Sequence, residues 1–218
     1  MTSTSEADEH AKTRIVLWIA IPAVAVVALL AVFLANRTNG TSATGANQFK
    51  FQVGQPGPGA TAPPIQLIAN DQTPFRLADY TGKNVLLYFQ EGVGCQPCWD
   101  QMTDIEQRRN SFQALGIDNI VSITTSPAGQ VKEKAAQEKV SMPVLSDPDL
   151  AVSKAYGAND YGMMGNQMDG HSFILVGPDG KIRWRADYGG APDYTMYVPS
   201  KALLADIRSG LADSGQGT

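Results

Sequence analysis

The chain has 218 residues, enough for one domain of ordinary size with appendages at its ends. Its formal net charge at pH 7 is −4, and its Lys and Arg residues form no cluster larger than doublets such as Arg108-Arg109. This distribution argues against a nucleic-acid partner, because nucleic-acid-binding proteins concentrate basic residues on one surface.

The first candidate element is an uninterrupted apolar stretch at residues 15–35, which follows a short tail at residues 1–14. It contains no charged residue and is long enough to cross a hydrocarbon core, which takes about 20 apolar residues. A cleaved signal peptide is the alternative, but its apolar region is usually only ~7 to 15 residues long. Lys12 and Arg14 precede the stretch and Arg37 follows it, a weak bias that places the tail in the cytoplasm. We therefore expect a single-pass membrane protein whose C-terminal domain lies outside the cytoplasm.

Residues 36–60 are rich in Gly, Ser, Thr, Asn and Pro, a composition typical of a flexible linker. The segment FKFQV within this linker alternates apolar and polar residues, which is consistent with one short strand. From residue 61 the sequence alternates apolar segments with turn residues, as expected of a packed domain. We expect this domain to extend over residues 61–212 and to leave a polar tail at residues 213–218.

The domain alternates predicted strands and helices. IQLI and FRLADY flank an Asn70-Asp71 turn and predict a hairpin, and NVLLYF has the continuous apolar character of a buried strand. A helix is predicted from near Pro97 to Leu115, where apolar residues keep roughly helical spacing. Next come the strand IDNIVSITT, the helix PAGQVKEKAAQEKV, the strand MPVLSD, the short helix DLAVSKAYG, the hairpin strands HSFILV and KIRWRADY, and a final helix at residues 200–208. This order predicts an α/β fold with a central mixed sheet flanked by helices.

The chain's only two cysteines, Cys95 and Cys98, lie in EGVGCQPCWD, directly after the strand NVLLYF. A disulfide that closes so short a loop stabilises a fold very little, so a structural staple is the weakest explanation. The predicted helix opens at this motif, and its free amide groups and dipole favour Cys95 as a thiolate, the species that attacks a disulfide. Cys98, about one turn further on, is then placed to resolve the mixed disulfide.

Three neighbours of the cysteines are candidate supporting residues. Pro97 suits the first turn of a helix, because it has no amide hydrogen to leave unsatisfied. Trp99 is expected to pack beside the motif or under the helix rather than to contact substrate. Glu91 is a candidate proton relay to the cysteines, and a solvated loop carboxylate is its simpler interpretation.

The arrangement VLLYFQEGVGCQPCW, then LSDPDLAVSKAYG, then HSFILVGPDGKIRWR resembles the thioredoxin-like superfamily over about residues 61–212. It is most similar to bacterial redoxin proteins related to peroxiredoxins and to membrane-anchored TlpA-type thiol-disulfide oxidoreductases. The resemblance implies a thioredoxin-like fold with an N-terminal hairpin extension. It also implies a dithiol/disulfide cycle on Cys95 and Cys98 without a cofactor, protein thiol or disulfide clients, and an electron donor in the bacterial cell membrane.

A peroxiredoxin-like thiol peroxidase with antioxidant activity is the first alternative. In that family a proline and a threonine precede the peroxidatic cysteine, and if Cys98 is set there, Glu91 and Cys95 occupy their positions. The family also has an arginine near the start of the strand HSFILV, where thioredoxins have a cis-proline and this chain has His171. These departures favour thiol-disulfide exchange over peroxide reduction.

A copper(I) chaperone similar to the SCO type is the second alternative. Copper(I) prefers soft thiolate and thioether ligands, so Cys95, Cys98 and His171 together form a chemically sensible site. The SCO family, however, spaces its cysteines by three residues rather than two. Without copper, His171 is expected either to steer or protonate the cysteines or to make an ordinary hydrogen bond at a strand edge.

Two Met-rich or Tyr-rich segments follow in the sequence. The methionines of YGMMGNQMDG are either plain packing residues or a soft surface for apolar segments of a substrate. Residues 188–199, YGGAPDYTMYVP, form either an extra strand or a rim beside the active site. Both questions stay open at the level of the sequence.

Overall fold

The computed structural model describes residues 41–44 and 49–215. Contacts divide the chain into two units, Met1–Thr41 and Ser42–Thr218, and the fold below is that of the second unit. The predicted membrane span at residues 15–35 lies outside the described residues. Within the described part of the chain, no helix combines the length and apolar character needed to cross a membrane.

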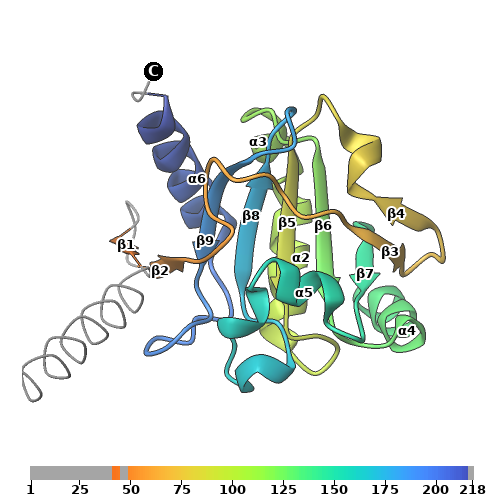
Figure 1. Ribbon diagram of the computed structural model, residues 1–218. Helices are drawn as coiled ribbons and strands as arrows, with labels where there is room; N and C mark the ends of the chain where they lie inside the picture. The colour runs from red at the N-terminus through yellow and green to blue at the C-terminus, as the bar shows by residue number, and fades with distance from the viewer. Residues whose placement is uncertain (1–40, 45–48, 216–218) are drawn as a thin grey trace, which may run out of the picture. The chain divides into compact units, whose positions relative to one another are not determined.

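The second unit is built on one mixed sheet with the strand order β1-β2-β9-β8-β5-β6-β7-β3-β4 (Figure 1). The strands are β1 Thr41–Thr44, β2 Lys50–Val53, β3 Gln66–Ala69, β4 Pro74–Arg76, β5 Val85–Gln90, β6 Asn119–Thr124, β7 Val144–Ser146, β8 Ser172–Val176 and β9 Ile182–Asp187. The central strand β5 runs parallel to β6 and antiparallel to β8. The predicted mixed sheet is therefore confirmed.

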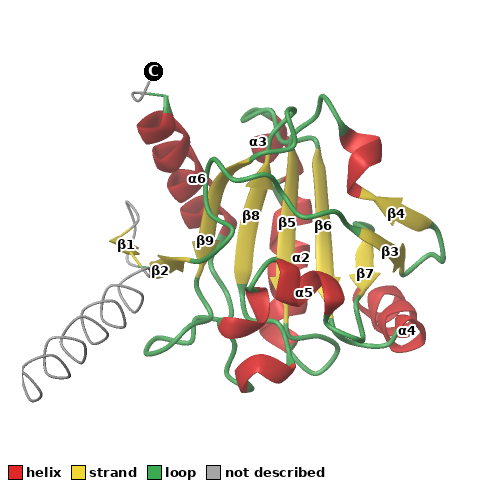
Figure 2. Ribbon diagram, in the orientation of Figure 1, coloured by secondary structure: helices red, strands yellow, loops and turns green. Residues whose placement is uncertain are grey.

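Helices cover both faces of this sheet (Figure 2). They are α2 Gln96–Gln107, α3 Arg109–Gln113, α4 Ala128–Glu138, α5 Ala151–Ala155 and α6 Ser200–Ser214, with short 3-10 helices η1 Leu77–Tyr80, η2 Ala158–Asp160 and η3 Gly165–Gln167. Every residue of β5 is buried, and its side chains alternate between two core clusters. Leu86 and Tyr88 pack on the side of α2, whereas Leu87 and Phe89 pack on the side of α5. Burial on both faces explains why this strand is continuously apolar in sequence.

The two hairpins predicted from turn residues are confirmed, since β3 pairs with β4 and β8 pairs with β9, both antiparallel. Two predicted helix boundaries were wrong. The helix after the cysteines is interrupted at Arg108, where the sequence is polar and offers no apolar periodicity. The last helix continues to Ser214 through Gly210, where a Cβ atom would lie 2.3 Å from Cδ1 of Trp184. This glycine permits close packing instead of ending the helix.

Part of the segment that the sequence assigns to a linker contacts the sheet. β2 pairs antiparallel with β9, and the ring of Phe51 contacts the rings of Trp184 and Tyr188. Further along, the amide of Gly59 donates to the carbonyl of Ile182 at 2.8 Å. Residues 49–60 therefore lie along the folded domain, and the expected short strand within them is present as β2.

Candidate active site

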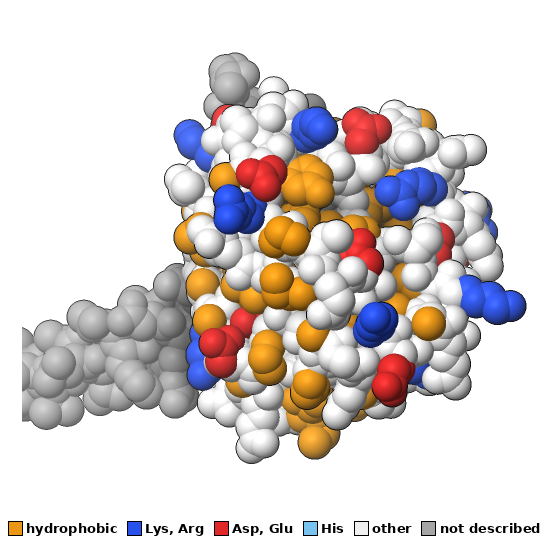
Figure 3. All heavy atoms as spheres, turned by 90° about the vertical axis from the view of Figure 1, so that its right-hand side faces the viewer, with side chains coloured by type: hydrophobic (Ala, Val, Ile, Leu, Met, Phe, Trp, Pro, Cys, Tyr) orange, Lys and Arg blue, Asp and Glu red, His pale blue; other side chains and the backbone are white. Residues whose placement is uncertain are grey.

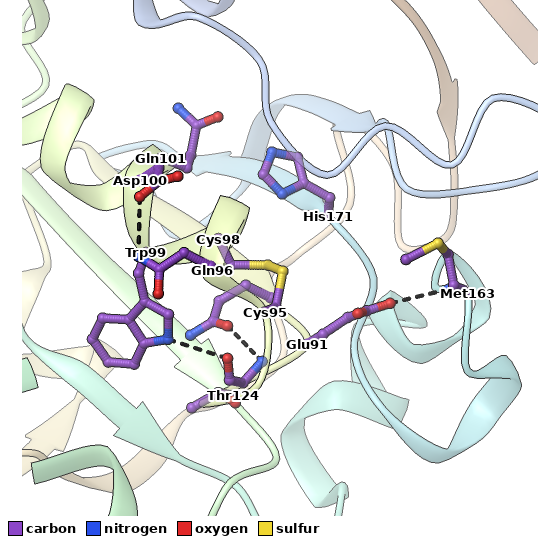
Figure 4. Close-up of a disulfide and its surroundings, with 12 residues drawn as sticks. Glu91, Cys95, Gln96, Cys98, Trp99, Asp100, Gln101, Thr124, Met163 and His171 are labelled. Carbon is purple, nitrogen blue, oxygen red and sulfur yellow. Dashed lines mark hydrogen bonds between the residues drawn. A yellow bond between two sulfur atoms is a disulfide. The ribbon is translucent and has the colours of Figure 1, made fainter. Parts of the chain in front are cut away.

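Cys95 and Cys98 lie where β5 leads into α2, and a disulfide joins them with their Cα atoms 5.3 Å apart (Figure 4). Cys95 is the N-cap residue of α2, and its carbonyl oxygen accepts hydrogen bonds from the amides of Cys98 and Trp99. Cys95 is partly exposed, whereas Cys98 is 0% exposed. A partner molecule therefore reaches the sulfur of Cys95 first.

The N-terminus of α2 favours negative charge at Cys95. No side chain caps this end of the helix, and Pro97 in its first turn has no amide hydrogen. The dipole of this 12-residue helix stabilises an anion at its N-terminus. Once the disulfide is opened, a Cys95 thiolate at that position is stabilised, which favours Cys95 as a leaving group.

The loop between β5 and Cys95 follows a path that only glycine permits at residue 92. Gly92 has a φ of +119°, and a Cβ atom there would lie 2.2 Å from Oγ of Ser126. Three hydrogen bonds anchor the loop: Gly92 N to Gln90 Oε1 (2.6 Å), Val93 N to Ser126 Oγ (3.1 Å) and Trp99 Nε1 to Gly92 O (3.2 Å). Trp99 is 0% exposed, and its indole thus packs under the motif and ties the loop to α2.

Glu91 lies beside the disulfide rather than out in solvent (Figure 4). Its exposed fraction is only 9%, and its Oε1 atom accepts a hydrogen bond from the amide of Met163 at 3.1 Å. Burial, and to a smaller degree the charge of Glu91, raises the pKa of Tyr88 well above its usual value. Glu91 thus connects Met163, through a hydrogen bond, with the buried Tyr88, through its charge.

His171, which immediately precedes β8, is among the residues that surround the disulfide in Figure 4. It is completely buried, and its Nδ1 atom shares a hydrogen bond of 2.9 Å with the hydroxyl of Tyr88. Its Nε2 atom has no hydrogen-bond partner among the described residues. Burial lowers the pKa of His171 to about 3, so the imidazole is neutral at pH 7. The site thus contains a neutral imidazole with one nitrogen held by Tyr88 and the other unpaired.

The sequence did not point to two polar residues of this site, Tyr88 and Gln101. Gln101 is 0% exposed and lies three residues after Cys98, hence on the same face of α2. Its Oε1 atom accepts from the amide of Val198 at 2.8 Å, and its Nε2 atom has no partner among the described residues. A glutamine on the apolar face of a predicted helix was a usable signal for Gln101. A tyrosine within an apolar strand gave no signal for Tyr88.

Nothing in the described part of the chain groups three or more His, Cys, Asp or Glu side chains in an arrangement that could hold a metal ion. Of the copper(I) ligands suggested by the sequence, Cys95 and Cys98 are bonded to each other, and Nδ1 of His171 is engaged by Tyr88. The arrangement supports redox chemistry carried by the two cysteines themselves.

Comparison with known proteins agrees with this chemistry. Residues 58–185 match the AhpC/TSA family. A Mycobacterium tuberculosis (strain H37Rv) protein named as a candidate peroxiredoxin is 33% identical over 130 residues, covering 57% of this chain and 81% of that protein. Thiol-disulfide oxidoreductase ResA of Geobacillus thermodenitrificans is 30% identical over 99 residues, covering 45% of this chain and 56% of that protein.

Solved structures share the fold. Enterococcus faecalis AhpC superposes with a TM-score of 0.61 at 16% identity, covering 74% of this chain and 96% of that chain. Mycobacterium tuberculosis peroxidoxin BcpB gives a TM-score of 0.58 at 21% identity, covering 70% and 96%. The predicted thioredoxin-like fold and the resemblance to redoxin proteins are therefore confirmed.

Proposed function

The chain belongs to the AhpC/TSA family, and we propose that it is a thiol-disulfide oxidoreductase that exchanges disulfides with protein clients through Cys95 and Cys98. One observation carries this proposal: the disulfide lies at the N-terminus of α2 with Cys95 partly exposed and Cys98 buried. A partly exposed cysteine at a helix N-terminus, bonded to a buried second cysteine, suits a two-step exchange.

In the first step a client thiolate attacks Sγ of Cys95, and the electron pair of the broken bond goes to the sulfur of Cys98. In the second step another client thiol attacks the mixed disulfide and releases Cys95 as a thiolate, which the helix N-terminus stabilises. The client gains a disulfide, and the cysteine pair takes up two electrons and two protons. The same steps run in reverse when a reduced pair meets a client disulfide, and the relative potentials decide the direction.

We propose that His171 is the hydrogen-bond partner of Cys98 during the cycle; with a pKa of about 3 its imidazole stays neutral, so it can pass a proton on but not store one. The Cys98 sulfur has no contact with solvent, so its thiolate is costly and a proton must reach it or leave it at each cycle. The imidazole of His171 is neutral, and its Nε2 atom is unpaired among the described residues. Glu91 is the less suitable relay, since the amide of Met163 already engages its carboxylate.

A peroxiredoxin-like peroxidase is the second candidate, and the match to a relative named as a peroxiredoxin favours it. Peroxide would oxidise the Cys95 thiolate to a sulfenic acid and release water or an alcohol, and Cys98 would condense with it to give the same disulfide and a second water. Cys98 itself is a poor site of attack because it is 0% exposed. His171 also stands where that family has its arginine, so no guanidinium is available there to activate a peroxide.

We further propose that the domain works outside the cytoplasm on an N-terminal membrane anchor, as TlpA-type proteins do. The uncharged apolar sequence of residues 15–35 and the short positively charged tail before it support this placement. Thiols in that compartment meet oxidising conditions, so a membrane electron donor is the partner expected to keep the pair reduced if it acts as a reductant.

The two candidates separate in one kinetic experiment on the reduced protein, freed of reductant. We expect a peptide disulfide to react faster than hydrogen peroxide, Cys95→Ser to abolish the reaction, and Cys98→Ser to accumulate a mixed disulfide at Cys95, detected by mass spectrometry. A peroxide reaction at least tenfold faster than the disulfide reaction, with sulfenic acid on Cys95, would assign the protein to the peroxidases.

A further inference from the structure

Large apolar side chains are exposed in two loops near the disulfide. Among the described residues, five large apolar side chains are exposed, and four of them lie at residues 161–168 or 188–199. They are Met163 (55%), Met164 (60%), Tyr194 (43%) and Tyr197 (38%). The fifth, Ile68 on β3, is 43% exposed. Exposed apolar groups gathered on one part of a soluble domain are typical of a binding surface.

Both loops contact the groups that form the site. The amide of Met163 donates to Oε1 of Glu91, and Gly162 lies against the backbone of Gly170, the residue before His171. The second loop begins with the amide of Tyr188 donating to the carbonyl of His171 at 2.8 Å. It ends on α2, where Val198 N donates to Gln101 Oε1 and Tyr197 OH donates to Asp104 Oδ2 at 3.3 Å. Figure 1 shows both loops at the end of the sheet where β5 leads into α2.

The segments around the disulfide carry negative charge only. Residues 91–100, 158–170 and 188–199 contain five acidic residues and no Lys or Arg. Three of the acidic residues are exposed: Asp100, Asp160 and Asp193. Lys134 of α4 reaches this area through a hydrogen bond from its Nζ atom to Gln96, but its charge is paired with Glu138. The face turned to the viewer in Figure 3, by contrast, mixes basic and acidic side chains.

We propose that residues 161–168 and 188–199 form a client-binding rim that selects polypeptide segments with apolar and basic side chains next to the reacting cysteine. This inference rests on the proposed exchange function and adds its substrate class. Methionine side chains adapt to many apolar shapes, and tyrosines offer rigid apolar faces with a polar tip. The acidic residues attract a positively charged segment and repel a negatively charged one. A peroxide or a small disulfide has no groups that would use these contacts.

The test compares three disulfides with the reduced protein: a peptide with Leu and Arg beside its cysteine, the same peptide with Ser and Glu there, and glutathione disulfide. Second-order rate constants are measured under single-turnover conditions by acid quenching and mass spectrometry. We expect the Leu/Arg peptide to react about tenfold faster than the Ser/Glu peptide, with the advantage shrinking at 0.5 M NaCl because salt screens the acidic residues. Equal rates for the two peptides, or a faster reaction of the Ser/Glu peptide, would contradict the proposed selectivity of the client-binding rim.

Variants then locate the effect. The double variant Met163→Ser/Met164→Ser should lower the ratio of the Leu/Arg peptide rate to the glutathione disulfide rate about fivefold. Ile68→Ser, which removes an equally large exposed side chain from β3, should leave that ratio unchanged. An unchanged ratio in the double variant contradicts the rim. Absence of reaction between wild-type protein and all three disulfides contradicts the exchange function itself, so the two failures are distinguishable.

Discussion

The two sides of the Cys95–Cys98 disulfide differ in almost every physical property. On the outer side, Cys95 is partly exposed and its surroundings include exposed methionines and carboxylates. On the inner side, Cys98 is 0% exposed, and Tyr88 and His171 lie in the buried floor of the site. The reactivity of the Cys95 sulfur therefore depends on access and on nearby charge, whereas that of the Cys98 sulfur depends on burial and on proton supply. Changes on the outer side should alter rates and specificity, whereas changes on the inner side should also alter stability.

The loop at Gly92 leads from β5 to Cys95 and is anchored to Ser126 and Trp99. A substitution at Gly92 should therefore have the largest effect on the stability of the protein. Gly92→Ala forces a Cβ atom to within 2.2 Å of Ser126 Oγ and 2.9 Å of Thr124 Oγ1 at a φ of +119°. We expect a loss of about 3 kcal/mol or more in the free energy of unfolding, measured by urea titration. Gly94→Ala is the matched control, because a Cβ atom there meets nothing within 4 Å. Equal effects of the two substitutions would show that the loop is not restricted as described.

The inner side should make the protein sensitive to acid through His171. Its pKa is lowered from 6.5 to about 3 by burial. Between these two pH values the unfolded chain is protonated at His171 and the folded protein is not. Stability that is present above pH 6.5 is lost as the pH falls, by about 3 kcal/mol between pH 6.5 and pH 4 from this group. His171→Asn removes this contribution. Its unfolding free energy should be lower than that of the wild type at pH 7 and approach it at pH 4; parallel curves would contradict the assignment.

A pH effect of the opposite sign is expected at Asp169, which lies between residues 161–168 and His171. Ser153 Oγ lies 2.6 Å from Asp147 Oδ2 and 3.1 Å from Asp169 Oδ2, and its one proton can serve only one of them. A protonated Asp169 completes the second bond, and burial followed by the charge of Asp147 raises the pKa of Asp169 well above its usual value. A raised pKa means that stability is full at low pH and falls as the pH rises toward the folded-state pKa.

Asp169→Asn keeps a neutral donor at this position and removes the proton equilibrium. We expect the unfolding free energy of the variant to rise relative to that of the wild type as the pH increases from 5 to 8, because the wild type loses stability over this range and the variant has no proton to lose at this position. Urea titrations at several pH values measure this difference. A difference that stays constant with pH would show that Asp169 is ionised throughout.

The sequence predicted the strand, loop and helix that carry the two cysteines, because the sequence patterns that indicate them are local. A continuous apolar strand, glycines, and a proline in a first helical turn identify the passage from β5 through Cys95 into α2. The turn at Gly177–Gly180 likewise identified the hairpin of β8 and β9. These signals depend on residues within one or two turns of each other, which is the range over which sequence periodicity is informative.

The inner contacts could not be predicted in the same way. Tyr88 and His171 are 83 residues apart, and no spacing rule links a tyrosine of one strand with the residue before another. Gln101 and Val198 meet across 97 residues for the same reason. The alternation in FKFQV indicated the strand β2, but nothing in the sequence indicated that β2 pairs with β9. Long-range pairing of this kind is decided by how the helices and strands pack, and the local pattern carries little trace of it.

The reduction potential of the Cys95/Cys98 couple, measured by equilibration with glutathione buffers, tests the redox role most directly. An exchange-active pair should show a reversible two-electron couple between about −270 and −120 mV, the span from thioredoxin to the strong periplasmic oxidants. A value near the lower limit indicates that the pair reduces its clients, and a value near the upper limit indicates that it forms disulfides in them. A potential below about −300 mV, typical of structural disulfides, would contradict a redox role for the two cysteines.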